Sequence, residues 1–421
     1  MSAVRPAANP APGTVRKLPR LAVVVSHPIQ HFAAFYRAIA RSGAVDLHVF
    51  FGARIGLDPY FDKGMNTTVS WNTDLLSGYA HSFLPKAASV KRRTPLALND
   101  PALAGRLSDF APDVVLIYGY NSINALRALR WCRRQGVPAL MIADSEDRQQ
   151  RAPWKRLLKR LALPRLLSAF DAFLTVGDAN EAYYRRYGVS QERMFRSPFT
   201  IDEESFRKAI ARREHHRAEF RQQHDIPADA FLAIFVGKLS ERKRPQDLVE
   251  AIDRLKGQTQ VHAALAGNGV LLRDLERRAE GLPVTFLGFV NVDELPRAYV
   301  AADVLVHTSA IDPHPLVCSE AAICGLPMIL SDRVGAAGPT DVARPGENAL
   351  IYPCGDTAAL AEQLRLISSD PALHQTMSTA SERIFSEVDV QASVAGVISA
   401  LTALIPLSTA PTAVAAARHA A

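Results

Sequence analysis

The chain has 421 residues, of which 48% are hydrophobic and 22% charged, and its 49 basic and 42 acidic residues give a formal charge of +7. This composition is typical of a globular protein, which excludes a disordered or fibrous chain, and the length predicts two or three domains. The chain has no apolar run of the ~18 residues that a membrane-spanning helix needs, no secretory signal and no paired cysteine spacing, so we expect a cytoplasmic protein with reduced thiols.

Short apolar runs alternate with helical patterns along the whole chain. In the first half, buried strands are expected at 21–26, 45–51, 113–119, 137–143 and 172–178, with helices at 31–41 and 122–135. The second half restarts the pattern with strands at 231–237, 261–269, 284–290, 302–309 and 326–332, and with a helix that begins near Pro245. Apolar runs that alternate with helices indicate parallel sheets buried on both faces. We therefore predict an α/β fold of two Rossmann-like domains that face each other across a cleft.

The composition also suggests where these domains begin and end. We expect a tail at 1–18, a first domain at 19–200, a second domain at 201–385, a C-terminal helix at 386–407 that packs back on the first domain, and a tail at 408–421. A charged helix at 207–224 leads into the second domain, and the last helical segment runs over 372–405. Ligands of open α/β sheets bind at the carboxyl ends of the strands, so the site should lie on loops from both halves.

Two loops of the second half have the composition of a phosphate site. The sequence GKLSERKRP (237–245) places Lys238 and Lys243 between a strand and a helix, where cations suit a diphosphate. The alternative is an ordinary solvated basic loop. In AGNG (266–269), Gly267 and Gly269 allow bare backbone to approach a nucleotide, although a plain turn has the same composition.

Two carboxylates follow in the segment 307–332. Asp312 lies in a proline-rich loop after a strand, and Glu320 comes eight residues later, at the start of a small-residue helix. Both side chains are suited to accept hydrogen bonds from sugar hydroxyls. A helix cap or a partner for the helix dipole is the alternative interpretation.

The order of these elements resembles that of the family-4 retaining glycosyltransferases of GT-B fold, the glycosyl transferases group 1. The matching features are Gly237-Lys238, Lys243, the Gly-x-Gly turn, FLGFV (286–290), Asp312-x7-Glu320, EAAICGLP (320–327), SDRVG (331–335) and PGENALIYPCGD (345–356). The resemblance covers roughly 228–385, and the first half is compatible with it.

The resemblance implies an enzyme that moves a sugar from a nucleotide-diphosphate donor to a polysaccharide, glycolipid or other glycan acceptor, with the anomeric configuration retained. It implies neither a metal nor any cofactor besides the nucleotide sugar. By the same resemblance Asp312 lies near the transferred sugar as a catalytic residue. The other donor residues are implied to be Lys238, Lys243, Leu316 and Val317 at the diphosphate, and Glu320, Gly267, Gly269, Phe289 and Val290 at the ribose and base.

The sequence departs from the family pattern in both halves of the chain. Asp312 stands where a glutamate is usual, and Pro315, which has no N–H, stands where a glycine is usual. These departures leave open a degenerate, non-catalytic GT-B protein that acts as a binding or assembly partner in glycan synthesis. The histidine usual after the strand near 141–147 is also absent, so His27 and His31, after the first strand, are the remaining catalytic candidates; a structural role is the alternative.

The segment 148–165 is basic and contains interleaved leucines and Trp154. This composition suits an interfacial helix, in which Lys155, Arg156, Lys159 and Arg160 contact an anionic membrane and Pro164 limits the helix. We therefore predict a peripheral protein on the inner face of the membrane; an ordinary amphipathic helix is the alternative. Nucleic-acid binding is not expected, because no nucleic-acid module accompanies the basic run.

Overall fold

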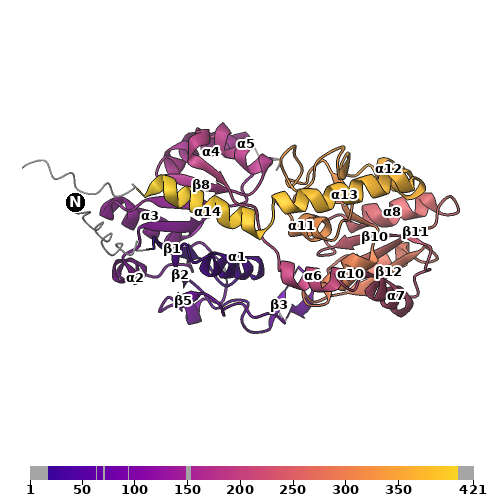
Figure 1. The fold of residues 1–421 in the computed structure, drawn as a ribbon, viewed down its shortest axis with the longest axis horizontal. Coiled ribbons are helices and arrows are strands. Elements are labelled where there is room, and N and C mark those ends of the chain that lie inside the picture. Colours follow the sequence, from indigo (N-terminus) through magenta and orange to yellow (C-terminus); the bar gives the residue numbers. More distant parts are fainter. Residues whose placement is uncertain (1–17, 63, 70–71, 93, 148–152, 406–421) are drawn as a thin grey trace, which may run out of the picture.

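The computed structural model describes residues 18–62, 64–69, 72–92, 94–147 and 153–405. The chain forms two lobes side by side, each built on a parallel sheet covered by helices (Figure 1). The predicted α/β fold with two Rossmann-like domains is therefore confirmed.

The first domain contains a seven-stranded parallel sheet of order β5-β2-β1-β6-β7-β8-β9 and a separate antiparallel pair, β3 and β4. Its elements are β1 Arg20–Val25, α1 Gln30–Arg41, β2 Asp46–Phe51, β3 Tyr60–Asp62, β4 Thr67–Val69, β5 Ala80–Phe83, the 3₁₀ turn Ala87–Ser89, α2 Leu103–Phe110, β6 Val114–Tyr118, α3 Ile123–Gln135, β7 Ala139–Ile142, α4 Pro153–Leu167, β8 Ala172–Thr175, α5 Asp178–Arg186, the 3₁₀ turn Gln191–Arg193 and β9 Met194–Arg196.

The second domain has a six-stranded parallel sheet of order β12-β11-β10-β13-β14-β15. Its elements, with the helices that precede and follow the sheet, are α6 Glu203–Ile210, α7 Arg213–Gln223, β10 Phe231–Val236, α8 Pro245–Leu255, β11 Val261–Ala266, α9 Leu272–Arg278, β12 Val284–Gly288, α10 Leu295–Ala301, β13 Val304–His307, α11 Leu316–Ile323, β14 Met328–Ser331, β15 Ala349–Tyr352, α12 Thr357–Ser369, α13 Pro371–Glu387 and α14 Val390–Leu404.

Alternation along the central strand of each sheet explains why both faces are covered. In β1, the side chains of Leu21 and Val23 enter one core cluster and that of Ala22 enters another, on the opposite face. In β10, Leu232 and Ala233 likewise belong to different clusters. Since successive side chains of a strand point to opposite faces, a continuous apolar run needs helices on both sides of its sheet.

The C-terminal segment connects the two domains. Helix α13 contacts α11 and α12 of the second domain, whereas α14 crosses to the first and packs on α1, β8 and β9 (Figure 1). The side chains of Val394, Val397 and Leu401 are buried in the same cluster as β1. Within the described residues, Pro371–Leu404 has the length and apolar composition of one membrane span.

Three expectations about helix boundaries are wrong. The segment 372–405 is two helices, because Asp389 caps α14 through the amides of Gln391 and Ala392. The segment 207–224 is also two, α6 and α7. Helix α4 continues through Pro164 to Leu167 instead of ending there.

Candidate active site between the two domains

The basic loop after β10 is tied to the loop after β13, because these two strands are neighbours in the sheet. The hydroxyl of Thr308 donates to the carbonyl oxygens of Lys243 and Arg244, at 2.7 and 2.8 Å. The backbone N–H of Ala310 donates to the carbonyl of Arg242 at 2.8 Å. Strand order therefore brings the two predicted phosphate and sugar loops together at the carboxyl edge of the sheet.

Lys243 and Asp312 form a shielded ion pair in this loop cluster. The Lys243 ammonium donates to the Asp312 carboxylate, and the two side chains are only 13% and 11% exposed. His307, fully buried at the end of β13, also contacts Asp312, with 2.8 Å from Nε2 to Oδ2. Burial alone would raise the pKa of Asp312, but the His307 hydrogen bond and the Lys243 charge outweigh it and hold this pKa well below its usual range.

Lys238, the other predicted phosphate ligand, is paired with a residue of the first domain. Its ammonium lies 2.8 and 2.7 Å from the two carboxylate oxygens of Asp62, at the end of β3. The backbone N–H of Asn72 is also 3.4 Å from the side-chain oxygen of Asn291. The β3–β4 hairpin thus reaches the second domain. Lys238 keeps 38% of its side chain exposed, so a ligand can still approach it.

The glycines of the Gly-x-Gly turn are explained by contact between loops. A Cβ on Gly267 would lie 1.8 Å from the carbonyl oxygen of Gly237, and one on Gly269 would lie 2.2 Å from that of Leu239. Gly267 also has a φ of +152°, which L side chains rarely adopt. The missing side chains therefore let the turn pack against the Lys238 loop. After β12, Phe289 and Val290 are partly buried, and Val290 packs on the domain core.

Helix α11 carries the other predicted donor residues. Leu316 and Val317 form its first turn, where backbone N–H groups have no partner within the helix, and no side chain caps this end. Glu320 lies in the second turn, not at the helix start as expected, so it is not a cap. Its Oε2 accepts from the Tyr299 hydroxyl at 2.7 Å, and burial raises the pKa of its carboxyl to about 7.

Glu320 faces a small crevice of about 70 Å³ that is lined by both domains. His31 of the first domain also lines this crevice. It belongs to the first turn of α1, whereas the sequence predicted that it would lie in a loop. Burial lowers the pKa of His31 to about 4, so the ring is neutral near pH 7. His27 does lie in the loop after β1, and its Nδ1 is 2.7 Å from the Ser26 hydroxyl. The two candidate histidines therefore have different surroundings.

A larger cavity of about 390 Å³ lies at the carboxyl ends of β1, β6 and β7 in the first domain. Its lining includes the polar side chains of Ser26, Asn121, Ser122 and Asp144. Burial raises the pKa of the Asp144 carboxyl. Asp144 lies in the region 141–147, where the sequence lacks the histidine that is usual in the family, and it was not singled out from the sequence. Its position directly after a predicted strand was the signal that could have identified it.

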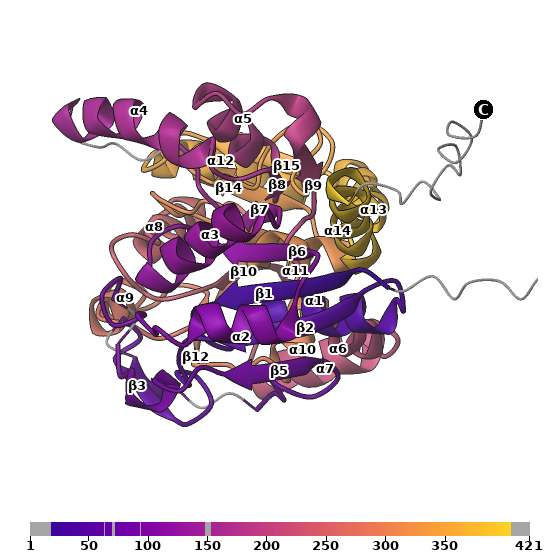
Figure 2. The same ribbon diagram turned by 90° about the vertical axis from the view of Figure 1, so that its left-hand side faces the viewer.

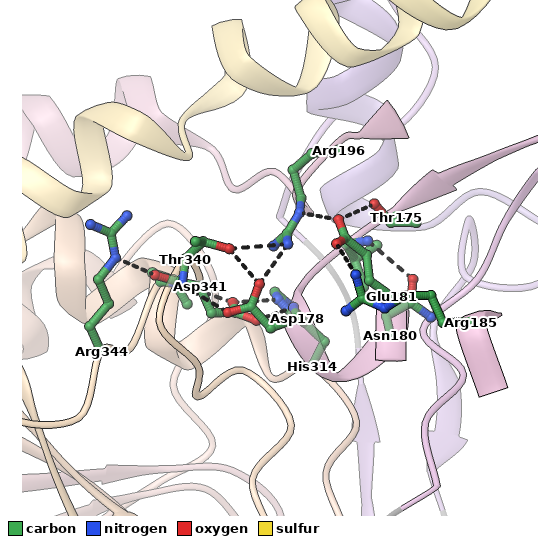
Figure 3. Close-up of polar contacts among 12 residues, drawn as sticks. Thr175, Asp178, Asn180, Glu181, Arg185, Arg196, His314, Thr340, Asp341 and Arg344 are labelled. Carbon is green, nitrogen blue, oxygen red and sulfur yellow. Dashed lines mark hydrogen bonds and ion pairs between the residues drawn. The ribbon is translucent and has the colours of Figure 1, made fainter. Parts of the chain in front are cut away.

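A polar cluster connects the domains beside this site (Figure 3). Asp178, at the start of α5, accepts from the backbone N–H of Thr340 at 2.8 Å and from Arg196 at 2.6 Å. The backbone N–H of Asp178 donates to Asp341 at 2.9 Å, and Asp341 in turn contacts Nε2 of His314 at 3.2 Å. Because His314 is two residues from Asp312, the first domain supports the loop that leads into α11.

Of the predicted membrane segment, residues 148–152 lie outside the described residues, and the rest belongs to helix α4, which projects from the first domain (Figure 2). Lys159 was predicted to contact the membrane, but its ammonium is held against the first domain. It lies 3.3 Å from Asp147 and 4.3 Å from the centre of the Tyr183 ring. Arg160 is exposed, as is Leu161. The side chains of Lys155 and Arg156 lie outside the described residues. Among the residues that are described, no group of three or more His, Cys, Asp or Glu side chains is arranged to hold a metal ion.

The comparisons with known proteins agree with this architecture. Residues 216–383 match the family model of glycosyl transferases group 1, and residues 80–199 match that of the glycosyl transferase 4-like domain. A GDP-mannose-dependent alpha-(1-6)-phosphatidylinositol dimannoside mannosyltransferase of Mycobacterium tuberculosis is 28% identical over 283 residues, which are 64% of this chain and 68% of the relative. A lipopolysaccharide core biosynthesis glycosyltransferase of Rhizobium meliloti is 32% identical over 38% of this chain and 45% of the relative.

Solved structures show the same fold at low identity. HepE of Anabaena in complex with UDP has a TM-score of 0.67 and 17% identity, with 92% of this chain and 100% of that chain covered. Sucrose-phosphate synthase of Thermosynechococcus elongatus also gives 0.67, at 19% identity, with 90% and 97% covered. Taken with the two family models, which together span more than half of the residues, these likenesses place the chain in the group 1 glycosyltransferases of GT-B fold.

Proposed function

We propose that this protein is a metal-independent, retaining glycosyltransferase that takes a nucleotide-diphosphate sugar as donor. The observation that carries the proposal is the cluster of Lys243, Asp312 and the first turn of α11 at the carboxyl edge of the second sheet. An ammonium group and the free N–H groups of a helix terminus are suited to neutralise a diphosphate leaving group without a metal ion. Asp312 is held ionised in that cluster, where it can accept a hydrogen bond from the transferred sugar.

The first-domain cavity is the proposed acceptor site. It lies at the carboxyl ends of β1, β6 and β7, and its hydroxyl, amide and carboxylate side chains are suited to bind sugar hydroxyls. The names of two relatives refer to a phosphatidylinositol dimannoside and to the lipopolysaccharide core. These names support a lipid-linked glycan as the acceptor class, with a polysaccharide or other glycan as the wider range.

Nucleotide binding tests the donor site directly. Isothermal titration with UDP, GDP, ADP, dTDP and CMP, each also as a sugar conjugate, should identify one base that binds the parent protein. Lys243→Gln should then weaken binding about ten- to a hundredfold, because it removes a charge-assisted contact. Lys208→Gln, on the exposed surface of α6, is the matched control.

Lys243→Gln needs a check of folding, since the lysine is shielded and paired with Asp312. A thermal unfolding curve should show that the variant remains folded at the assay temperature. Failure of every nucleotide to bind the parent would refute the donor assignment. Nucleotide binding without hydrolysis or transfer of any sugar would instead favour the non-catalytic assembly partner.

Two further measurements test the mechanism. Transfer should persist in excess chelator, and loss of activity that Mg²⁺ or Mn²⁺ restores would refute metal independence. The anomeric coupling constant of the product, measured by NMR, should equal that of the donor sugar. An inverted product would refute the retaining assignment.

We also propose that the protein is cytoplasmic and reaches its acceptor at an anionic membrane surface through α4. The projecting helix and the exposed side chains of Arg160 and Leu161 support this contact. Binding to anionic vesicles should fall with salt, because attraction to such a surface decays within a Debye length. Replacement of Lys155, Arg156 and Arg160 by Glu should abolish it. Equal recovery in the supernatant with neutral and anionic vesicles at low salt would refute membrane contact.

A further inference from the structure

The crevice between the domains contains an unusual set of polar atoms without partners. Nε2 of Gln30 and Nε2 of His31 are buried, and neither has a hydrogen-bond partner within the described residues. Both residues line the 70 Å³ crevice together with Glu320, whose Oε2 accepts from the Tyr299 hydroxyl. Buried polar groups are normally satisfied, so two such atoms from residues that line one crevice, beside a carboxylate, indicate a bound polar group.

The chemistry of these atoms restricts what that group can be. The Glu320 carboxylate, when ionised, only accepts hydrogen bonds. The Gln30 amide nitrogen only donates, and the neutral His31 ring donates or accepts according to its tautomer. A vicinal diol satisfies such a set, because each hydroxyl both donates and accepts. A phosphate, which offers only acceptors near neutral pH, would instead be repelled by the Glu320 carboxylate.

We propose that Gln30 and His31 recognise the ribose diol of the donor nucleotide from the first domain, opposite Glu320 in the second. This inference rests on the proposed function. It adds a nucleoside contact from the domain that otherwise binds the acceptor. Donor binding then bridges the two domains, so part of the donor affinity depends on how they are held together.

Removal of the diol on the ligand and removal of its partners on the protein form a double-mutant cycle. Titration of the parent with the preferred nucleoside diphosphate and with its 2′,3′-dideoxy analogue should show a loss of affinity. In Gln30→Leu and in His31→Leu the ratio of the two dissociation constants should be about three- to tenfold smaller than in the parent, since each variant removes one hydrogen bond. Gln246→Leu is a matched control, because the Oε1 of Gln246 is also buried without a partner but does not line the crevice.

The cycle separates this inference from the proposed function. A parent protein that binds no nucleoside diphosphate overturns both. If the parent binds the nucleotide, but the affinity difference between the nucleotide and its dideoxy analogue is the same in Gln30→Leu and His31→Leu as in the parent, the ribose contact alone is overturned. A free sugar with a vicinal diol could instead compete with the nucleotide for the parent protein but not for Gln30→Leu. This result would assign the crevice to the acceptor and would overturn the proposal that it binds the ribose.

Discussion

The raised pKa of Glu320 predicts that stability falls as the pH rises. An ordinary glutamate titrates near 4.5, and burial moves the Glu320 pKa to about 7 in the folded protein. Between these values the folded protein keeps a proton that the unfolded chain releases, so stability is lost across this window and is constant above it. The rise from 4.5 to about 7 corresponds to at most about 3.5 kcal/mol, since one pKa unit is worth about 1.4 kcal/mol.

Glu320→Gln removes the titration and keeps a carbonyl oxygen for the Tyr299 hydroxyl. The variant should match the parent near pH 4.5 and exceed its melting temperature by several degrees at pH 8, because each kcal/mol shifts Tm by about 2–4 °C in a domain of this size. His31 also lines the crevice, and its titration, with a pKa lowered to about 4, is present in both proteins. Arg37, Asp74 and Asp202 also line the crevice and are the same in both proteins.

Differential scanning calorimetry of parent and variant at half-unit steps from pH 4.5 to 8 measures the difference directly. Ionisation of Glu320 also affects ligand binding. The parent should bind its nucleotide more tightly as the pH rises through 7, and the variant should not. A difference in Tm that is constant with pH would refute the assignment of a raised pKa to Glu320.

Three other variants test contacts that the structure shows. Asp62→Asn should release Lys238 and strengthen nucleoside diphosphate binding by up to about fivefold in isothermal titration, since a partly exposed ion pair contributes at most about 1 kcal/mol; weaker binding would contradict competition between the carboxylate and the ligand. Asp178→Ala removes the contacts of the Asp178 side chain with Thr340 and should enlarge the radius of gyration in small-angle scattering; an unchanged radius would contradict a role of this carboxylate in holding the domains together. Gly267→Ala should lower Tm far more than Gly43→Ala, because only at Gly267 would the new Cβ collide with backbone, so equal shifts would contradict the loop contact.

The sequence predicted the central strands because their apolar runs leave few alternatives. The run FLAIFV, for example, forms β10, and its buried residues divide between two core clusters. The strands that were missed, such as β3 and β9, have three residues each, which is too short for a period to be visible. The break at Asp389 was missed for a different reason, since a single capping residue decides it.

The candidate site was less predictable because its partners are distant in the sequence. Lys238 was identified from its own loop, but its partner Asp62 lies 176 positions away on another domain. The two glycines of AGNG were interpreted as room for a ligand, whereas backbone of the neighbouring loop occupies that space. Gln30 gave no signal at all, because an isolated glutamine becomes informative only when its surroundings are known to be buried and without a partner.

The pairing of both candidate phosphate lysines has a consequence for which ligands can bind. Lys243 is already neutralised by Asp312 and Lys238 by Asp62, so an entering anion exchanges one charge partner for another. A single negative charge gains little by such an exchange. A diphosphate carries charge enough to engage both lysines together with the amides of α11, and its attraction can exceed that of the two separate carboxylates. In the proposed donor complex, therefore, the carboxylates of Asp62 and Asp312 favour the binding of multiply charged ligands over singly charged ones. Asp62 is the more exposed of the two, so a donor displaces it first.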